Sequence, residues 1–150
     1  PELSPDIAVE PLEDLDLAWV AGKGLDLPSR ALTPSDLKAY PIITNPRPSK
    51  LYATIQEWFA SVGDMPTRLY TCNSLSIMAN LASKGFGLSL LPVGLFQGEM
   101  KRGALRILQA VSYTHLRAHE IAYRIDPGRP NLKPIRDVCH ALIAAATKRK

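Results

Sequence analysis

Small polar side chains gather at three places in this sequence where an extended segment gives way to a turn or a helix. These places are residues 44–49, 71–74 and 87–92. Serine and threonine hydroxyls, asparagine amides and the free N–H groups of a helix N-terminus all donate hydrogen bonds to an anion. If the three places share one edge of a sheet, these donors converge on a cleft that favours a carboxylate or a phosphate.

Each candidate residue also has a structural interpretation, and the sequence leaves both open. Ser49 and Ser74 stand where helix caps are expected, and capping alone accounts for many serines at such positions. Arg47 can pair with an anionic ligand, but a lone loop arginine is more often a solvated surface charge.

Other kinds of site find no support in the residue pattern. Gly85 and Gly87 follow an expected helix and lack the third glycine of a dinucleotide fingerprint, and no G-x-S-x-G elbow is present. His115, His119 and His140 offer metal ligands, but H-E-x-x-H is absent and part of their segment has strand character. No acidic pair can be placed in a common pocket. We therefore expect no catalytic residue, no metal site and no cofactor.

The elements that must position the cleft follow an α/β order. The Thr33-Pro34-Ser35-Asp36 run is a variant of the capping box. Strands are expected at 15–21, 41–44, 68–72, 88–91, 104–108 and 119–125, and helices at 34–39, 49–63, 74–85 and 131–147. The helix after Ser49 repeats apolar residues at helical spacing, namely Leu51, Ile55, Trp58, Phe59 and Val62. Strands and helices that alternate through short joins are typical of a parallel sheet, which binds ligands at the carboxyl ends of its strands.

Composition sets outer limits on the function. The chain has 150 residues, which fits one domain or a piece of one, and its 46% hydrophobic and 21% charged residues are ordinary for a globular protein. No apolar run reaches the roughly 20 residues of a membrane-spanning helix. The net charge of +4 is scattered apart from residues 148–150, so we expect a solvated tail and not a nucleic-acid arm.

Four motifs together resemble the LysR-type transcriptional regulators. They are Leu32–Leu37, Pro41–Ser49, Cys72–Leu75 and Gly85–Pro92, and their order and spacing over about residues 9–109 are similar to the C-terminal effector-binding region of that family. The stretch 103–106 is similar to the strand that follows in the family. The stretch 121–146 is similar to the family's returning strand and final helix. Residues 110–120 depart from the pattern, and 112–120 resembles a translated sequencing adapter, so no function is placed on its histidines.

The resemblance implies an α/β fold of the periplasmic-binding-protein-like type 2 class, with mixed, mostly parallel sheets flanked by helices. A small-molecule effector binds between the two subdomains of such a fold. Residues 33–108 would be the second subdomain, and residues 1–24 and 120–150 would be remnants of an incomplete first subdomain. The resemblance places effector contacts at eight positions, which are Thr44, Asn45, Arg47, Ser49, Asn73, Ser74, Leu91 and Pro92.

The resemblance also implies partners. Family members dimerise, often form tetramers, and bind DNA through an N-terminal winged helix-turn-helix that these 150 residues do not contain. Cys72 and Cys139 are too few and too far apart for a disulfide framework, which suits a reducing cytosol, so we expect a cytoplasmic protein. Hydroxyls together with Arg47 suit a small carboxylate as co-inducer. An alternative of the same fold is a solute-binding protein of a transporter, which would need a secretory signal. The motifs favour the regulator, with no membrane partner and no enzymatic activity.

Overall fold

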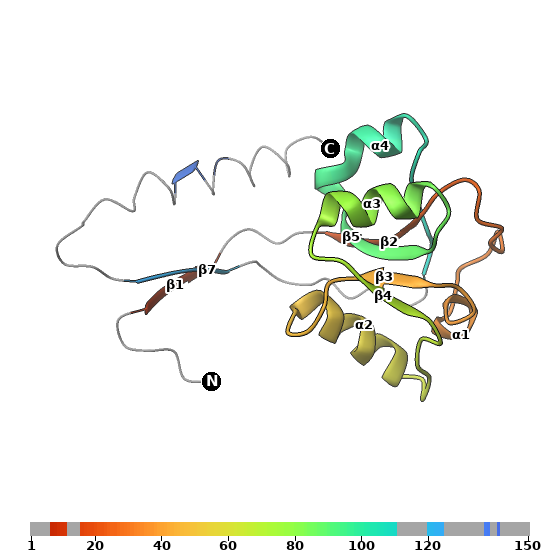
Figure 1. The fold of residues 1–150 in the computed structure, drawn as a ribbon, viewed down its shortest axis with the longest axis horizontal. Coiled ribbons are helices and arrows are strands. Elements are labelled where there is room, and N and C mark those ends of the chain that lie inside the picture. Colours follow the sequence, from red (N-terminus) through yellow and green to blue (C-terminus); the bar gives the residue numbers. More distant parts are fainter. Residues whose placement is uncertain (1–6, 12–15, 111–119, 125–136, 139–140, 142–150) are drawn as a thin grey trace. The chain divides into compact units, whose positions relative to one another are not determined.

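A computed structural model describes residues 7–11, 16–110, 120–124, 137–138 and 141 of the chain (Figure 1). Its contacts divide the chain into two compact units. One is Leu17–Thr114, and the other combines Pro1–Asp16 with His115–Lys150. The candidate effector residues all belong to the first of these units.

A mixed five-stranded sheet forms the centre of the unit Leu17–Thr114. Its strands are β2 (Leu17–Ala21), β3 (Ile42–Thr44), β4 (Leu69–Thr71), β5 (Leu88–Pro92) and β6 (Arg106–Ile107), in the spatial order β4-β3-β5-β2-β6. β3 pairs in parallel with both β4 and β5, whereas β2 is antiparallel to β5 and to β6. β2 belongs to the stretch 1–24 that the resemblance places with the first subdomain, yet it is hydrogen-bonded into this sheet and buried throughout.

Helices cover both faces of the sheet, with α3 (Leu75–Ser83) on one side and α2 (Lys50–Ala60) on the other (Figure 1). Successive strand residues point to opposite faces, and neighbours in β2 show this directly. Val20 packs in a cluster with Ile43, Leu91 and residues of α3. Trp19 instead packs against Trp58 of α2, with ring centroids 5.3 Å apart and ring planes tilted by 43°. The central strands β2, β3 and β5 are therefore buried on both sides, as their nearly continuous apolar residues predict, whereas the edge strands β4 and β6 are largely exposed.

Local capping chemistry sets the helix starts. Ser49 accepts a hydrogen bond from Tyr52 N at the start of α2, and Thr33 with Asp36 forms a complete capping box before α1 (Pro34–Leu37). The expected continuation of α2 to Val62 is wrong, because the helix closes at its Ser61 C-cap and leaves Val62 53% exposed. Gly63 follows with φ +69°, the left-handed conformation that ends the turn.

The remaining elements differ from expectation mainly in length. The strand expected at 104–108 is only two residues long, and η1 (Val93–Phe96) and α4 (Gln97–Lys101) precede it. β7 (Glu120–Arg124) falls within the strand expected at 119–125 and pairs antiparallel with β1 (Ile7–Pro11), which sequence analysis missed. Of the helix expected at 131–147, only residues 137, 138 and 141 are described, and all three are helical. The rest of it, and most of 110–120, lies outside the described residues.

The hydrogen bonds of the Asp36 carboxylate indicate how the stability of this unit should depend on pH. It accepts two hydrogen bonds from the Arg30 guanidinium, at 2.7 and 2.8 Å, and one from Thr33 N at 2.8 Å. The Arg30 hydrogen bonds, and then those from Thr33, lower the pKa of Asp36 well below its usual range. A carboxyl with a depressed pKa in the folded state stabilises that state above the ordinary Asp pKa of about 3.9, and this contribution is lost as the pH falls further.

We therefore expect the melting temperature of the wild-type chain to fall on acidification below about pH 4. The variant Asp36→Asn has no carboxyl to protonate at this position, so it should show a shallower fall over the same range. Thermal unfolding monitored by circular dichroism across a pH series checks this, with the exposed Asp26→Asn as the matched control. Parallel curves for wild type and Asp36→Asn would contradict the prediction.

Candidate functional site

The three polar junctions of the sequence lie at one edge of the five-stranded sheet. β3, β4 and β5 run in parallel, and Thr44, the last residue of β3, is opposite Thr71, the last of β4. Ile43 is opposite Ser89, which places the end of β5 at Leu91 and Pro92 just beyond Thr44. α2 and α3 are the next elements after β3 and β4 and are joined to them by short loops, so strand ends and helix N-termini come to the same edge.

Thr44 has an unusual environment at this edge. Its side chain is fully buried, at 0% exposure, and its backbone oxygen accepts a hydrogen bond from Cys72 N at 2.8 Å. Its hydroxyl Oγ1 has no hydrogen-bond partner among the residues that the structure describes. A buried hydroxyl without a partner costs about 1–3 kcal/mol, so Thr44 keeps a polar group where an apolar one would be more stable.

Asn45 and Asn73 stand on neighbouring junctions and have different surroundings. Asn45 Nδ2 donates to Cys72 O at 3.0 Å, and this bond ties the end of β3 to the end of β4. The Asn45 side chain therefore has a structural role, and its second Nδ2–H and its Oδ1 are the groups left for a ligand. Asn73 is exposed between Cys72 and the cap of α3.

Ser49 and Ser74 are both helix caps, which confirms the structural interpretation of these serines. Ser49 Oγ accepts from Tyr52 N at 3.0 Å, and Ser74 Oγ accepts from Ile77 N at 3.4 Å. Capping uses one acceptor site of each hydroxyl and leaves its proton free to donate. The role as helix cap is therefore compatible with a hydrogen bond to an anion at the same N-terminus.

Arg47 lies along α2 and not over its N-terminus. Its guanidinium carbon sits 4.7 Å from the centroid of the Tyr52 ring, and its Nη2 donates to Gln56 Oε1 at 2.9 Å. Gln56 is seven residues beyond the cap Ser49, which is about 10 Å along a helix axis. Gln56 Nε2 in turn donates to the Tyr52 hydroxyl at 3.2 Å, which closes a small network that sequence analysis did not foresee.

Leu91 and Pro92 are buried at the end of β5. The Leu91 side chain, at 0% exposure, belongs to the hydrophobic cluster beneath α3. Because β5 is a central strand covered on both faces, a ligand at this edge would meet the backbone of these residues more readily than the Leu91 side chain.

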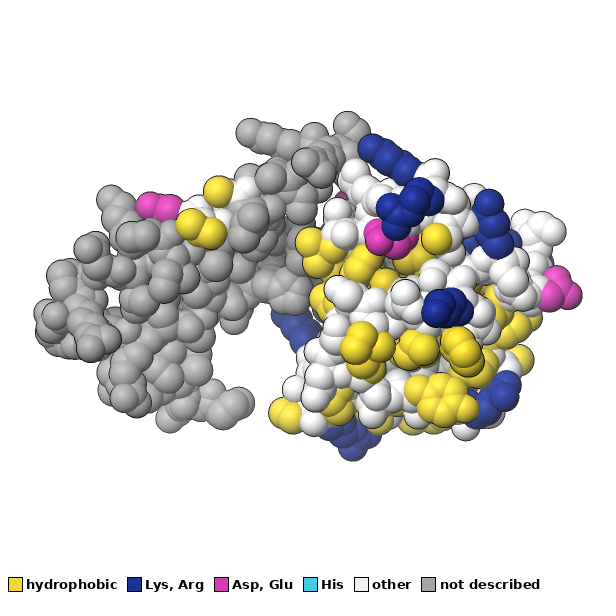
Figure 2. Space-filling view, turned by 45° about the horizontal axis from the view of Figure 1, so that its top comes forward, with side chains coloured by type: hydrophobic (Ala, Val, Ile, Leu, Met, Phe, Trp, Pro, Cys, Tyr) yellow, Lys and Arg dark blue, Asp and Glu magenta, His cyan; other side chains and the backbone are white. Residues whose placement is uncertain are grey.

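The charged and metal-ligating side chains of the described residues bear on two other kinds of site. On the face drawn in Figure 2, Lys and Arg side chains lie at several separate places and do not form one patch. Among the described residues, no group of three or more His, Cys, Asp or Glu side chains is arranged to hold a metal ion. Within the same residues, no helix is long and apolar enough to cross a membrane.

The fold is α/β and periplasmic-binding-protein-like, with a mixed five-stranded sheet flanked by helices. The family model of the LysR substrate binding domain matches residues 1–145. The chain therefore belongs to the LysR substrate-binding domain family, the effector-binding domains of LysR-type transcriptional regulators, and this is not a family of enzymes. No curated protein sequence matches the chain.

Solved structures of the same family have similar folds at low sequence identity. The effector-binding domain of AmpR from Citrobacter freundii is 19% identical with a TM-score of 0.67, over 97% of this chain and 70% of that one. The regulatory domain of MetR from N. meningitidis is 15% identical with a TM-score of 0.71, over 93% and 66%. The effector-binding domain of QuiR, solved in complex with shikimate, is 22% identical with a TM-score of 0.68, over 99% and 69%.

Proposed function

We propose that this domain binds a small carboxylate as co-inducer at the carboxyl edge of β3, β4 and β5. The observation that supports this most is the fully buried Thr44 hydroxyl, which has no partner among the described residues and stands where two helix N-termini begin. A ligand oxygen would give that hydroxyl the hydrogen bond it lacks. The QuiR domain, which is similar in fold, was solved with a hydroxylated carboxylate, shikimate.

The proposed contacts differ in how readily each group could reach an anion at the edge. Thr44 Oγ1, the Ser49 and Ser74 hydroxyls, and the first-turn N–H groups of α2 and α3 are hydrogen-bond donors at the edge. Asn45, Asn73 and the backbone of Leu91 and Pro92 complete the set together with Arg47. The Arg47 guanidinium would have to leave Tyr52 and Gln56 to reach an anion at the edge, so it would pair with the ligand only after its side chain changes rotamer.

The regulatory step follows from linkage between binding and conformation. We propose that residues 33–108 together with β2 form most of one subdomain, that 1–16 and 120–150 contribute to the other, and that the effector favours one arrangement of the two. Only an effector with different affinities for the two arrangements can shift their populations. In the whole regulator, which we place in the cytoplasm, this shift would alter a dimer or tetramer that holds DNA through its N-terminal domains.

A ligand screen on the chain tests the site chemistry. Shikimate and a panel of other small hydroxylated carboxylates would be compared with their methyl esters, which keep the shape and remove the charge. A carboxylate present at 100 times its Kd should raise the melting temperature by roughly 5 to 10 °C, and its ester should not. Equal stabilisation by acid and ester, or no stabilisation by any acid in the panel, would contradict the proposal.

A further inference from the structure

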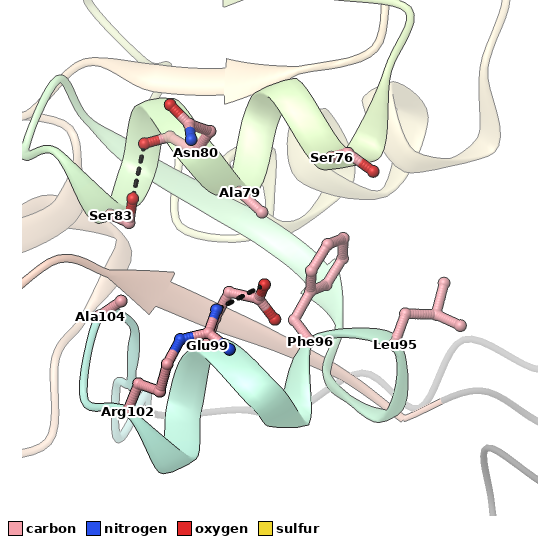
Figure 3. A pocket seen from close by; sticks show the side chains of 9 residues that line it. All are labelled: Ser76, Ala79, Asn80, Ser83, Leu95, Phe96, Glu99, Arg102 and Ala104. Carbon is pink, nitrogen blue, oxygen red and sulfur yellow. Dashed lines mark hydrogen bonds and ion pairs between the residues drawn. The ribbon is translucent and has the colours of Figure 1, made fainter.

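A pocket of about 400 Å³ lies between α3 and the segment formed by η1, α4 and the residues that follow (Figure 3). It shares no lining residue with the eight proposed effector contacts. Its volume falls in the range of small-molecule sites, which is about 300–1,000 Å³. All of its lining residues belong to the unit Leu17–Thr114.

The floor of the pocket is apolar. Ala79 of α3 is 3% exposed and Phe96 of η1 is 7% exposed; both belong to one hydrophobic cluster, and Figure 3 shows the Phe96 ring reaching toward α3. Leu95, which is 52% exposed, adds an apolar wall at one end. An aliphatic or aromatic group of a ligand would be removed from water here, which favours binding.

The rim of the pocket on the α4 side carries one charge of each sign. Arg102 Nη2 donates to Glu99 Oε1 at 3.1 Å, and the two side chains are 68% and 36% exposed. Each keeps most of its hydrogen-bonding capacity, because a guanidinium has five N–H donors and a carboxylate accepts at about four positions. Figure 3 shows the Glu99 carboxylate extending from α4 toward α3.

Because Gly98 has no side chain, the Arg102 guanidinium can lie close to the backbone at this position. A Cβ atom at position 98 would lie 3.3 Å from Arg102 Nη1, closer than nearly all real contacts of this kind. The guanidinium thus lies back against α4 beside Glu99, and the pair stands at the rim together. On the opposite side, Asn80 is exposed, and its amide offers both a donor and an acceptor.

We propose that this pocket binds a small zwitterion with an apolar side group, that is, an apolar α-amino acid. The ligand carboxylate would pair with Arg102 and its ammonium with Glu99, so that charges of opposite sign alternate around the rim. The apolar side group would lie on Ala79 and Phe96. A ligand with a single charge would satisfy only one of the two rim groups, and an uncharged ligand would satisfy neither.

Isothermal titration of the chain with three matched molecules tests this assignment. L-phenylalanine carries both charges, N-acetyl-L-phenylalanine only the negative one, and L-phenylalaninamide only the positive one. The zwitterion should bind about five-fold more tightly than either analogue, the equivalent of one exposed charge pair. Glu99→Gln should remove the advantage over the acetylated analogue, and Arg102→Gln the advantage over the amide.

Matched variants separate this site from its surroundings and from the sheet edge. Lys84→Gln and Glu57→Gln remove one exposed charge of each sign outside the pocket and should leave the affinity unchanged. Thr44→Val should also leave the affinity for phenylalanine unchanged, whereas it should weaken carboxylate binding at the edge about ten- to hundredfold. Equal affinity for the three molecules, no binding of phenylalanine, or loss of its binding in Thr44→Val would each overturn the assignment.

Discussion

Replacing Thr44 by valine is expected to remove most of the binding of a carboxylate effector without lowering the stability of the domain. Valine has nearly the same shape as threonine, and it deletes only the hydroxyl that lacks a partner among the described residues. A hydrogen bond to a charged group contributes about 1.5–3 kcal/mol, so the affinity should fall about ten- to hundredfold. Loss of an unsatisfied buried hydroxyl should raise the free energy of unfolding by about 1 kcal/mol.

Ser89→Ala is the matched control for this variant. Ser89 is also fully buried on a neighbouring strand, but its hydroxyl donates to Ile43 O at 2.8 Å. Loss of this hydrogen bond in Ser89→Ala should lower the free energy of unfolding by about 1 kcal/mol and leave effector affinity unchanged. Denaturant titration and calorimetry on both variants give the comparison. If Thr44→Val destabilises the domain as Ser89→Ala does and binds effector normally, the Thr44 hydroxyl has no part in binding.

The features that the sequence predicts correctly depend on residues close together in the chain. The cap of α2 needs only Ser49 and the N–H of Tyr52, and the capping box of α1 needs only Thr33 and Asp36. The alternation of short apolar strands with amphipathic helices is likewise a local pattern. Local hydrogen-bonding chemistry and periodicity therefore suffice to predict the α/β order, whereas the shared edge of the three strands depends also on their order in the sheet.

The features that the sequence does not predict depend on residues far apart or on the direction of a flexible side chain. The bond from Asn45 to Cys72 joins two junctions that meet only because β3 and β4 are neighbours. The Arg47 side chain has many rotamers, and the sequence pattern does not indicate which of them it adopts. Its contact with the Tyr52 ring could therefore not be predicted. The pocket between α3 and α4 combines Asn80 with Arg102, which come from separate segments of the chain, so no motif marks it.

The substitution Phe59→Ala should cause the largest loss of stability in the unit Leu17–Thr114. Phe59 is 0% exposed, and its ring centroid lies 5.1 Å from that of Trp58 and 6.4 Å from that of Trp19, in edge-to-face geometry. Truncation of a buried phenylalanine costs about 3–5 kcal/mol, through lost transfer free energy and the cavity left behind. This is a large share of the roughly 5–15 kcal/mol that stabilises a typical domain.

Denaturant unfolding followed by tryptophan fluorescence measures this loss, because both neighbouring rings are tryptophans. Phe59→Leu keeps most of the volume and should cost less than about 1.5 kcal/mol. Phe86→Ala removes a phenylalanine that is 62% exposed and should change stability by no more than about 0.5 kcal/mol. A Phe59→Ala variant as stable as Phe86→Ala would show that this aromatic cluster does not hold α2 against the sheet.

The effect of Phe59→Ala on effector binding should differ from that of Thr44→Val. The Ser49 cap and the side chains that contact Arg47 belong to α2, so Phe59→Ala affects them by unfolding the domain. Effector binding by this variant should therefore weaken only as the folded fraction of the protein falls.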